Sequence, residues 1–372
     1  MKKVVFTLSM LALLASCGDD NTTPKKDENP IKPEEPAVVE KKVMTASIGG
    51  GTQPNHVYID LSTGKETPVV RDAWDLGFYC GNDNRVIINN TIKMAVKPLE
   101  TTNIDEVVTA DYTVAVSPNV AASNGWVDSP FGILASNNPG GGTAIAEISE
   151  NPDLNKVYLV NLGDDVANAA APETGAVNLS GAPRGWKKIK INRQGDKYIL
   201  HYANLNETTH KTIEISKNNT HNFVFFNLKD EKIVNNQPEK TKWDISFTGH
   251  TLYTGQSMQD AVLYYFADIC LTNIHGGAIS YQVELESGQQ RDTQYENFKL
   301  ADVDQAQFTA AANQHQLTIG RKWRNTMSRT LKDNAFYVIK DAEGNIFKLK
   351  FLAMMNDAGE RGHTTFEYQL LK

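Results

Sequence analysis

Hydrophobic and polar residues alternate with a period of two along most of the chain. The runs KKIKI, at 187–191, and IFKLKF, at 346–351, show this alternation clearly. Alternation of this kind is typical of β-strands that bury one of their two faces. Stretches with the spacing of a helix, such as 304–313, are short. The pattern therefore predicts an all-β protein made of antiparallel, β-sandwich-like domains with many short strands.

Two strand-rich segments occur twice in the chain, in the same order. The strings AWDLGF and KWDISF place Trp74 and Trp243 169 residues apart. The runs HVYIDL and NFVFFNL precede them, with Val57 and Val224 as equivalent residues 167 apart. Each run ends in turn residues and then resumes as a short strand, which predicts a hairpin before each tryptophan strand. The close agreement of the two separations indicates a tandem duplication.

Later strands continue the correspondence between the two halves. The matching pairs of strands are 156–160 with 335–339, 187–191 with 346–351, and 198–202 with 365–368. The first half also carries a Gly-, Ala- and Pro-rich insertion, which we expect to run over the surface. This common order predicts a first β domain over residues 43–217 and a second over residues 218–372.

The repeated Trp-Asp pair has a structural interpretation in such a domain. We expect Trp74 and Trp243 to bury their rings in central strands. The neighbouring side chains, Asp75 and Asp244, would point to the other face and meet a backbone N–H or a lysine. In this interpretation none of the four is a site residue.

The amino terminus has the features of a bacterial lipoprotein signal. Two lysines precede an apolar stretch, 4–14, that is too short to cross a bilayer as a helix. The string LASC, which ends at Cys17, fits the lipobox pattern. We therefore expect residues 1–16 to be a signal peptide and Cys17 to be lipidated, with an ordinary secretory signal as the alternative. The Pro-, Lys- and Glu-rich remainder of residues 17–42 is expected to be a flexible linker.

Composition restricts the classes of function. Without the two lysines of the signal, 35 of the 37 Lys and Arg remain against 44 Asp and Glu, a net charge of −9. This balance, with no dense basic cluster, argues against a nucleic-acid partner. Besides Cys17 only Cys80 and Cys270 occur, so buried free thiols are favoured over a disulfide scaffold. No phosphate loop, H-E-x-x-H, G-x-S-x-G or zinc-type cysteine pair is found, and we expect no enzymatic activity.

Several of these strings together resemble the HmuY family of bacterial surface lipoproteins. They are the hairpin, the W-D-[LI]-x-F strand, the IGRKWRN stretch, and the late block FYVIKDAEGNIFKLKF…GHTTFEY. The resemblance is clear over 222–372 and extends to 43–215 through the repeat. It implies an all-β, haem-binding lipoprotein anchored in the outer membrane at the cell surface. Such a protein takes haem from host haemoproteins for iron acquisition and delivers it to a TonB-dependent receptor.

The resemblance also implies a haem iron held by two axial His or Met side chains. Met327, in the loop before a late strand, is the first candidate, and Met258 or His275 is expected opposite it. A solvated loop His and a core Met are the ordinary alternatives. In the first half Met94 is interpreted as core, and His56 shows no useful partner. No other metal is expected, and duplicated haem sites are not expected.

One alternative function stays open. A lipoprotein could keep this fold and use its loops to bind a glycan or protein ligand, as a non-haem binding or adhesion module.

Overall fold

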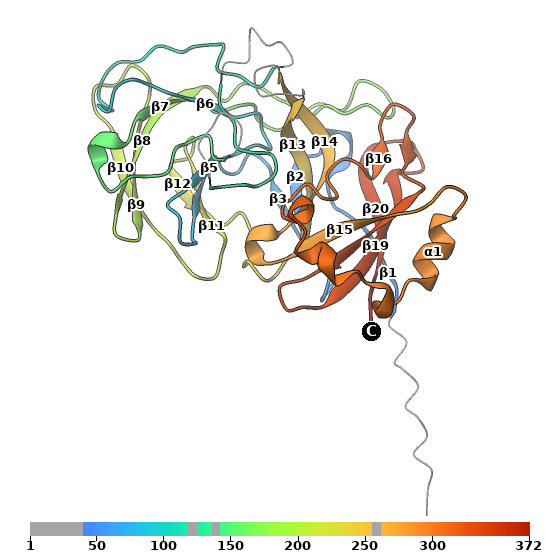
Figure 1. Ribbon diagram of the computed structural model, residues 1–372. Helices are drawn as coiled ribbons and strands as arrows, with labels where there is room; N and C mark the ends of the chain where they lie inside the picture. The colour runs from blue at the N-terminus through green and yellow to red at the C-terminus, as the bar shows by residue number, and fades with distance from the viewer. Residues whose placement is uncertain (1–39, 118–124, 136–141, 255–261) are drawn as a thin grey trace, which may run out of the picture. The chain divides into compact units, whose positions relative to one another are not determined.

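The computed structural model describes residues 40–117, 125–135, 142–254 and 262–372, and residues 39–372 form one compact unit. Every strand pair in the described ranges is antiparallel, and α1 (Arg291–Asn297) is the one α-helix there (Figure 1). The predicted all-β fold is therefore confirmed. The helical spacing at 304–313 corresponds to short 3₁₀ turns. Cys17 and Met258 lie outside the described residues.

The elements of the first half are β1 (Lys42–Thr45), η1 (Gly50–Thr52), β2 (Asn55–Asp60), β3 (Lys65–Val70), β4 (Leu76–Tyr79), β5 (Val86–Ile88), β6 (Ala95–Pro98), η3 (Pro152–Leu154), β7 (Val157–Asn161), β8 (Trp186–Gln194), β9 (Lys197–Ala203) and β10 (Lys211–Ser216). Those of the second half, besides α1, are β11 (Phe223–Asn227), β12 (Lys232–Val234), β13 (Ile245–Thr254), β14 (Val262–Thr272), η4 (Ile274–Gly276), β15 (Ile279–Glu284), η5 (Leu300–Asp302), η6 (Gln305–Phe308), η7 (Ala311–Asn313), β16 (Arg324–Asn325), β17 (Thr330–Leu331), β18 (Ala335–Lys340), β19 (Ile346–Met355) and β20 (Arg361–Leu370).

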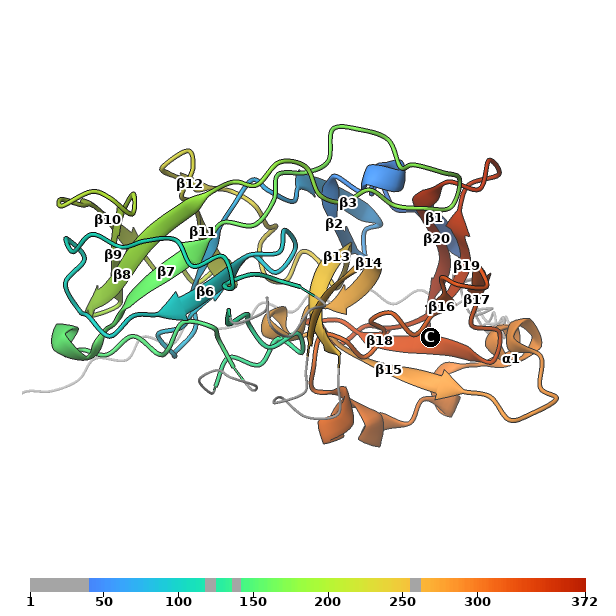
Figure 2. The same cartoon turned by 90° about the horizontal axis from the view of Figure 1, so that it is seen from above.

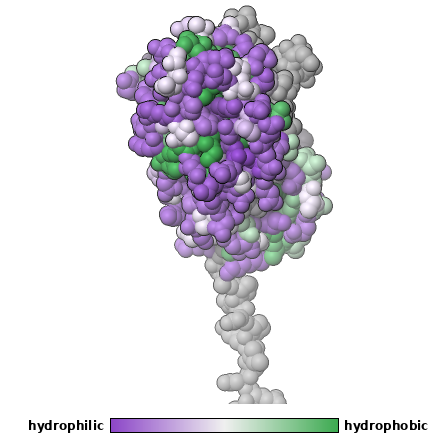
Figure 3. All heavy atoms as spheres, turned by 90° about the vertical axis from the view of Figure 1, so that its left-hand side faces the viewer, coloured by the Kyte–Doolittle hydropathy of each residue, from purple (hydrophilic) through white to green (hydrophobic). Residues whose placement is uncertain are grey.

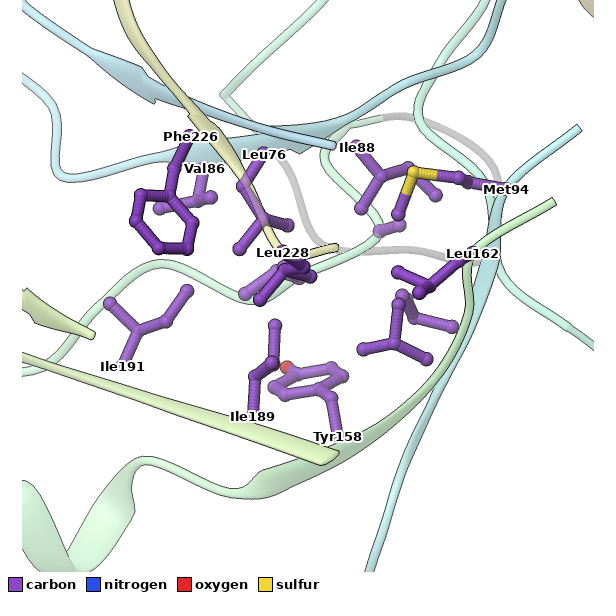
Figure 4. Packing of buried hydrophobic residues seen from close by; sticks show 14 of the residues in the cluster. Leu76, Val86, Ile88, Met94, Tyr158, Leu162, Ile189, Ile191, Phe226 and Leu228 are labelled. Atoms are coloured by element: carbon purple, nitrogen blue, oxygen red, sulfur yellow. The ribbon is translucent and has the colours of Figure 1, made fainter. Parts of the chain in front are cut away.

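The four larger sheets form two matching sets. One set contains the orders β12-β11-β4-β5 and β10-β9-β8-β7-β6. The other contains β14-β13-β2-β3 and β1-β20-β19-β18-β15. Each set encloses its own hydrophobic cluster, and polar residues cover most of the outer face over β8–β10 (Figure 3). The fully buried Met94 lies in the first cluster, as expected of a core residue (Figure 4).

The two repeats exchange their amino-terminal hairpins. The hairpin β2–β3 of the first repeat pairs with β13 of the second, with Ile59 opposite Ile245 (Figures 1 and 2). The hairpin β11–β12 of the second repeat pairs with β4 of the first, with Phe226 opposite Leu76. The two registers are equivalent under the repeat. Figure 4 accordingly shows Phe226 among first-repeat side chains.

Strand pairing therefore divides the chain differently from the sequence repeat. The strands of the first set run without interruption from Leu76 to Val234, whereas the second set combines residues 42–70 with residues 245–370. The predicted boundary between residues 217 and 218 marks where the repeat begins again in the sequence. The sheets run across it because the second hairpin turns back onto the first tryptophan strand.

Asp75 and Asp244 hold the exchanged hairpins in place. The Asp75 N–H donates to the Phe226 carbonyl at 2.9 Å, and its Oδ2 accepts the Leu228 N–H at 2.6 Å. The Asp244 N–H donates to the Ile59 carbonyl at 2.8 Å, and its Oδ2 accepts the N–H of Leu61 at 2.8 Å. The expectation that these carboxylates meet backbone N–H groups is confirmed.

The two aspartates differ in charge compensation. Asp75 forms a buried ion pair with Arg184. Among the described residues Asp244 has no ion-pair partner, and Asp341 and Asp60 add negative charge nearby. Burial, reinforced by these acidic neighbours, raises the pKa of Asp244 to about 7. Burial raises the pKa of Asp75 as well, but there the Arg184 charge opposes the shift, whereas no described cation opposes it at Asp244.

This difference predicts an unusual pH dependence for Asp244→Asn. Because the folded-state pKa of Asp244 is raised, its ionisation removes stability as pH rises from about 4 through 7. The free energy of unfolding of Asp244→Asn minus that of wild type should rise by on the order of 2–4 kcal/mol over that range. Urea unfolding at closely spaced pH values measures it.

Asp75→Asn is the matched control, since it removes the buried carboxylate partner of Arg184 and leaves only the partly exposed Asp165 paired with that guanidinium. It should lower the free energy of unfolding by on the order of 3 kcal/mol at pH 7. A flat Asp244→Asn difference across this pH range would contradict the interpretation.

Candidate functional site

A pocket lies where the exchanged hairpins meet the two tryptophan strands. It contains about 760 Å³ of atom-free space, part of it open to solvent, and both repeats line it. The part that a water-sized sphere can enter is about 100 Å³, which is smaller than an ordinary small-molecule site, so a large ligand would require the lining to move apart. Apolar and aromatic side chains dominate the lining.

Two equivalent aromatic walls face this pocket. The Trp74 ring packs edge-to-face on Phe225, with centroids 4.7 Å apart and planes at 69°. The Trp243 ring packs in the same way on Tyr58, at 4.9 Å and 75°. Tyr58 and Phe225 are 167 residues apart, the separation of the hairpins. Each wall thus combines the tryptophan of one repeat with a hairpin residue of the other.

The neighbouring parts of the lining are also equivalent. Asn89 and Asn273 fix the relation, because their side-chain amides donate to the carbonyls of Trp74 and Trp243, both at 2.8 Å. Residues on either side of these asparagines line the pocket in pairs: Ile87 with Leu271, Ile88 with Thr272, Asn90 with Ile274, and Thr91 with His275. The two repeats therefore build one shared pocket in place of two separate ones.

Three histidines line the pocket, and two of them make its two walls unequal. His56 stands where the second repeat has Phe223, and His275 stands where the first repeat has Thr91. Burial lowers the pKa of His56 to about 3 and that of His250 and His275 to about 4. All three are therefore neutral at pH 7, which is the state in which imidazole binds a metal.

The histidines differ in their hydrogen bonds. His56 Nε2 lies 2.9 Å from the Ser246 hydroxyl, and its Nδ1 lies 3.3 Å from that of Tyr58. Neither ring nitrogen of the buried His250 makes a hydrogen bond of good geometry. The ring of His275 packs edge-on against Phe223 at 5.6 Å. His250 thus has no side-chain partner among the described residues, and the Pro130 carbonyl is the backbone acceptor that approaches its ring.

A segment of the first repeat, residues 128–134, adjoins the pocket. The Asp128 carboxylate accepts the N–H groups of Ile88 and Ala144, both at 2.7 Å. The side-chain amide of Gln316 donates to the Pro130 carbonyl at 2.9 Å. The carbonyls of Pro130 and Gly132 raise the pKa of His250 and His275 slightly against burial, so the segment approaches both rings.

Asp128 sets the charge of the pocket. Burial raises its pKa to about 7, despite the two backbone N–H groups that favour its ionised form. Of the described residues that line the pocket, none is Lys or Arg. The site is therefore apolar, with one weakly ionised carboxyl and three neutral imidazoles.

The predicted ligands fall in different places. His275 lines the pocket. Met327 is 95% exposed in the turn between β16 and β17, and it is not a lining residue. Sequence reasoning missed the roles of Trp74 and Trp243, which line the pocket although only 5% and 7% of each residue is exposed. Their recurrence at equivalent positions was the available signal.

The comparisons with known proteins identify the family. A family model described as HmuY protein matches residues 52–189 and 219–368, which together cover more than half of the chain. The chain belongs to the HmuY family. Two successive HmuY matches also confirm the tandem duplication.

Two solved structures are similar to this HmuY-family chain. The crystal structure of apo PinO from Porphyromonas gingivitis has 11% identity and a TM-score of 0.25, covering 90% of this chain and 99% of its own. The apo HmuY analog TFO of Tannerella forsythia has 10% identity and a TM-score of 0.19, covering 90% and 96%. No curated protein matches the chain. Among the described residues, no helix is long and apolar enough to span a membrane.

Because neither ring nitrogen of His250 makes a hydrogen bond of good geometry, we expect its removal to affect stability in a particular way. His250→Leu removes buried nitrogens without partners and should raise the free energy of unfolding by about 1 kcal/mol. His56→Leu strands the Ser246 and Tyr58 hydroxyls and should lower it by about 1–3 kcal/mol. Urea unfolding of the ligand-free variants at pH 7 compares them. Equal losses in both would mean that His250 is a structural residue.

Proposed function

We propose that this HmuY-family chain binds haem in the pocket shared by its two repeats. The observation that carries the proposal is the buried imidazole of His250, which lines an aromatic pocket and makes no hydrogen bond of good geometry, although the Pro130 carbonyl approaches it. His275 offers a second neutral imidazole in the same lining. Haem, when bound, supplies an iron whose two axial positions accept such nitrogens.

The remaining lining fits this cofactor. The aromatic surface that a porphyrin ring needs would come from Trp74, Trp243, Phe223 and Phe225. His250 and His275 would hold the iron as neutral ligands. The Pro130 and Gly132 carbonyls, which approach these rings, must then release them, so we expect the segment 128–134 to move on binding.

The cellular role of the proposed binding follows the family resemblance. Cys17 would carry the lipid anchor, and the rest of residues 17–42 would tether the β body at the outer-membrane surface. Haem taken from host haemoproteins would pass to a TonB-dependent outer-membrane receptor. We propose a binding and transfer role, without catalysis.

A second candidate function rests on the charge of the pocket. No Lys or Arg among the described lining residues pairs with the two propionates of haem, and Asp128 carries negative charge when ionised. A neutral ligand, such as a sugar unit stacked on Trp74 or Trp243, would meet no such conflict. Glycan or protein binding is therefore the alternative.

Titration of the purified protein with haem tests the first function. Wild type should give a saturable Soret shift at one haem per chain. His250→Ala and His275→Ala should each weaken binding at least tenfold, because each removes an axial nitrogen. His210→Ala, on an exposed histidine paired with Asp105, is the matched control and should leave the titration unchanged.

The same titration examines the other proposed ligands. Met327→Ala should bind like wild type, since Met327 is solvent-exposed and outside the lining. Met258→Ala tests the remaining candidate. No saturable Soret shift in wild type, or full binding by His250→Ala and His275→Ala, would overturn the proposed site.

Membrane attachment is tested separately through Cys17. Cys17→Ser should remove the acylated thiol, so the protein should be lost from the outer-membrane fraction and keep its uncleaved signal peptide. Labelling with radioactive palmitate should be lost in parallel. Retention of label in Cys17→Ser would exclude lipidation at this residue.

A further inference from the structure

A short segment of the first repeat, residues 130–133, lies against the shared pocket and is fixed at both ends. Before it, the Asp128 carboxylate accepts two backbone N–H groups, and after it the buried Leu134 packs in an aromatic cluster. Between these anchors, the two large apolar side chains, Phe131 and Ile133, are 44% and 42% exposed. Burial of these side chains therefore contributes little to holding the segment against the pocket.

The second repeat holds this segment mainly through its backbone carbonyls. The side-chain amide of Gln316 donates to the Pro130 carbonyl at 2.9 Å, and the backbone N–H of Gln316 donates to the Phe131 carbonyl at 3.0 Å. The ring of Phe131 also meets His315 edge-on at 5.2 Å. A segment held by a few hydrogen bonds opens at a lower free energy than one with many buried apolar contacts.

Carbonyls of the same segment approach the two imidazoles that the proposed function uses. The Pro130 carbonyl approaches His250, and the Gly132 carbonyl approaches His275. A ring nitrogen that faces a carbonyl is not available to a metal. Only about 100 Å³ of the pocket can be entered by a water-sized sphere, so a large ligand does not fit while the segment is in place.

We propose that residues 130–133 form a lid over the shared pocket and that Gln316 is the latch that holds this lid closed. The closed lid competes with a ligand for the histidines, so the affinity falls in proportion to how rarely the lid opens. This inference rests on the proposed haem-binding function and adds the element that controls access to the site.

The latch can be tested by a substitution that tightens binding. Gln316→Ala removes the side-chain bond to the Pro130 carbonyl, which is made when the lid is closed. The open fraction should rise about fivefold, as expected for losing one neutral hydrogen bond, and the dissociation constant of haem should fall by the same factor. A wall residue that merely supports the pocket would instead weaken binding when it is removed.

Soret titrations at pH 7 measure this change. Gln282→Ala is the control, because Gln282 bonds to Glu284 outside the lining and its loss should leave the dissociation constant unchanged. Weaker or unchanged haem binding by Gln316→Ala would contradict the role of Gln316 as a latch.

A disulfide across the latch tests the lid directly. The Cγ of Gln316 lies 3.3 Å from the position of a Cβ on residue 132, so cysteines at both positions are within bonding reach. Gly132→Cys/Gln316→Cys, made with Cys80→Ser, should bind haem at least tenfold more slowly when oxidised than after reduction and removal of the reductant. The φ of +75° at position 132 strains a cysteine in both states, so the comparison is unaffected. Equal rates, with the bridge verified by mass spectrometry, would overturn the lid.

Amide hydrogen exchange examines the lid without any ligand. The Gln316 N–H donates to the lid, whereas the Thr272 N–H donates to the Gln316 carbonyl at 2.9 Å. The disulfide should slow exchange at residue 316 at least tenfold relative to the reduced protein and leave Thr272 unchanged. No slowing, or equal slowing at both amides, would overturn the lid while haem binding stands. Failure of wild type to bind haem would remove the proposed function, and the exchange rates would still decide whether the lid opens.

Discussion

The fold depends on a backbone N–H of one repeat reaching the aspartate carboxylate of the other. Leu228 donates to Asp75, and Leu61 donates to Asp244, each where a hairpin strand runs into its turn. A buried N–H must find an acceptor, so a hairpin shifted by one residue would leave this donor unpaired and turn its apolar side chains outward. Two carboxylates thereby fix the register of both exchanged hairpins.

The same exchange creates the pocket. Each tryptophan directly precedes its aspartate, so the residue that locks the hairpin also places the ring against an aromatic residue of that hairpin. With the hairpins exchanged, the two walls face a single space. The walls are unequal, because His56 stands at the position equivalent to Phe223 and His275 at the position equivalent to Thr91. One asymmetric site has arisen from two symmetric halves.

Sequence patterns predicted the local structure well and the pairing between repeats poorly. Alternation and the hairpins were accessible because each depends on neighbouring residues, and the duplication was accessible because its strings recur in the same order. That Asp75 and Asp244 meet a backbone N–H was expected, but not that this N–H belongs to the hairpin of the other repeat. The exchange was not accessible, since a hairpin has the same pattern whether it pairs with its own repeat or the other. The shared pocket was hidden for that reason, and Trp74 and Trp243 looked like core residues because their rings are indeed buried.

The candidate site, too, was predictable from the sequence only in part. His275 was accessible as a ligand-type residue in a long loop region, whereas His250 gained significance only from its lack of a hydrogen bond of good geometry. Trp323, His56 and the equivalent asparagines Asn89 and Asn273 are satisfied, whereas unpartnered buried atoms also occur outside the pocket, among them the Tyr337 and Tyr368 hydroxyls. A protein can keep unsatisfied buried groups only where the surrounding structure holds them in place. The two locked hairpins provide that rigid surrounding for the unpartnered groups of the pocket, which stand where both hairpins meet the tryptophan strands.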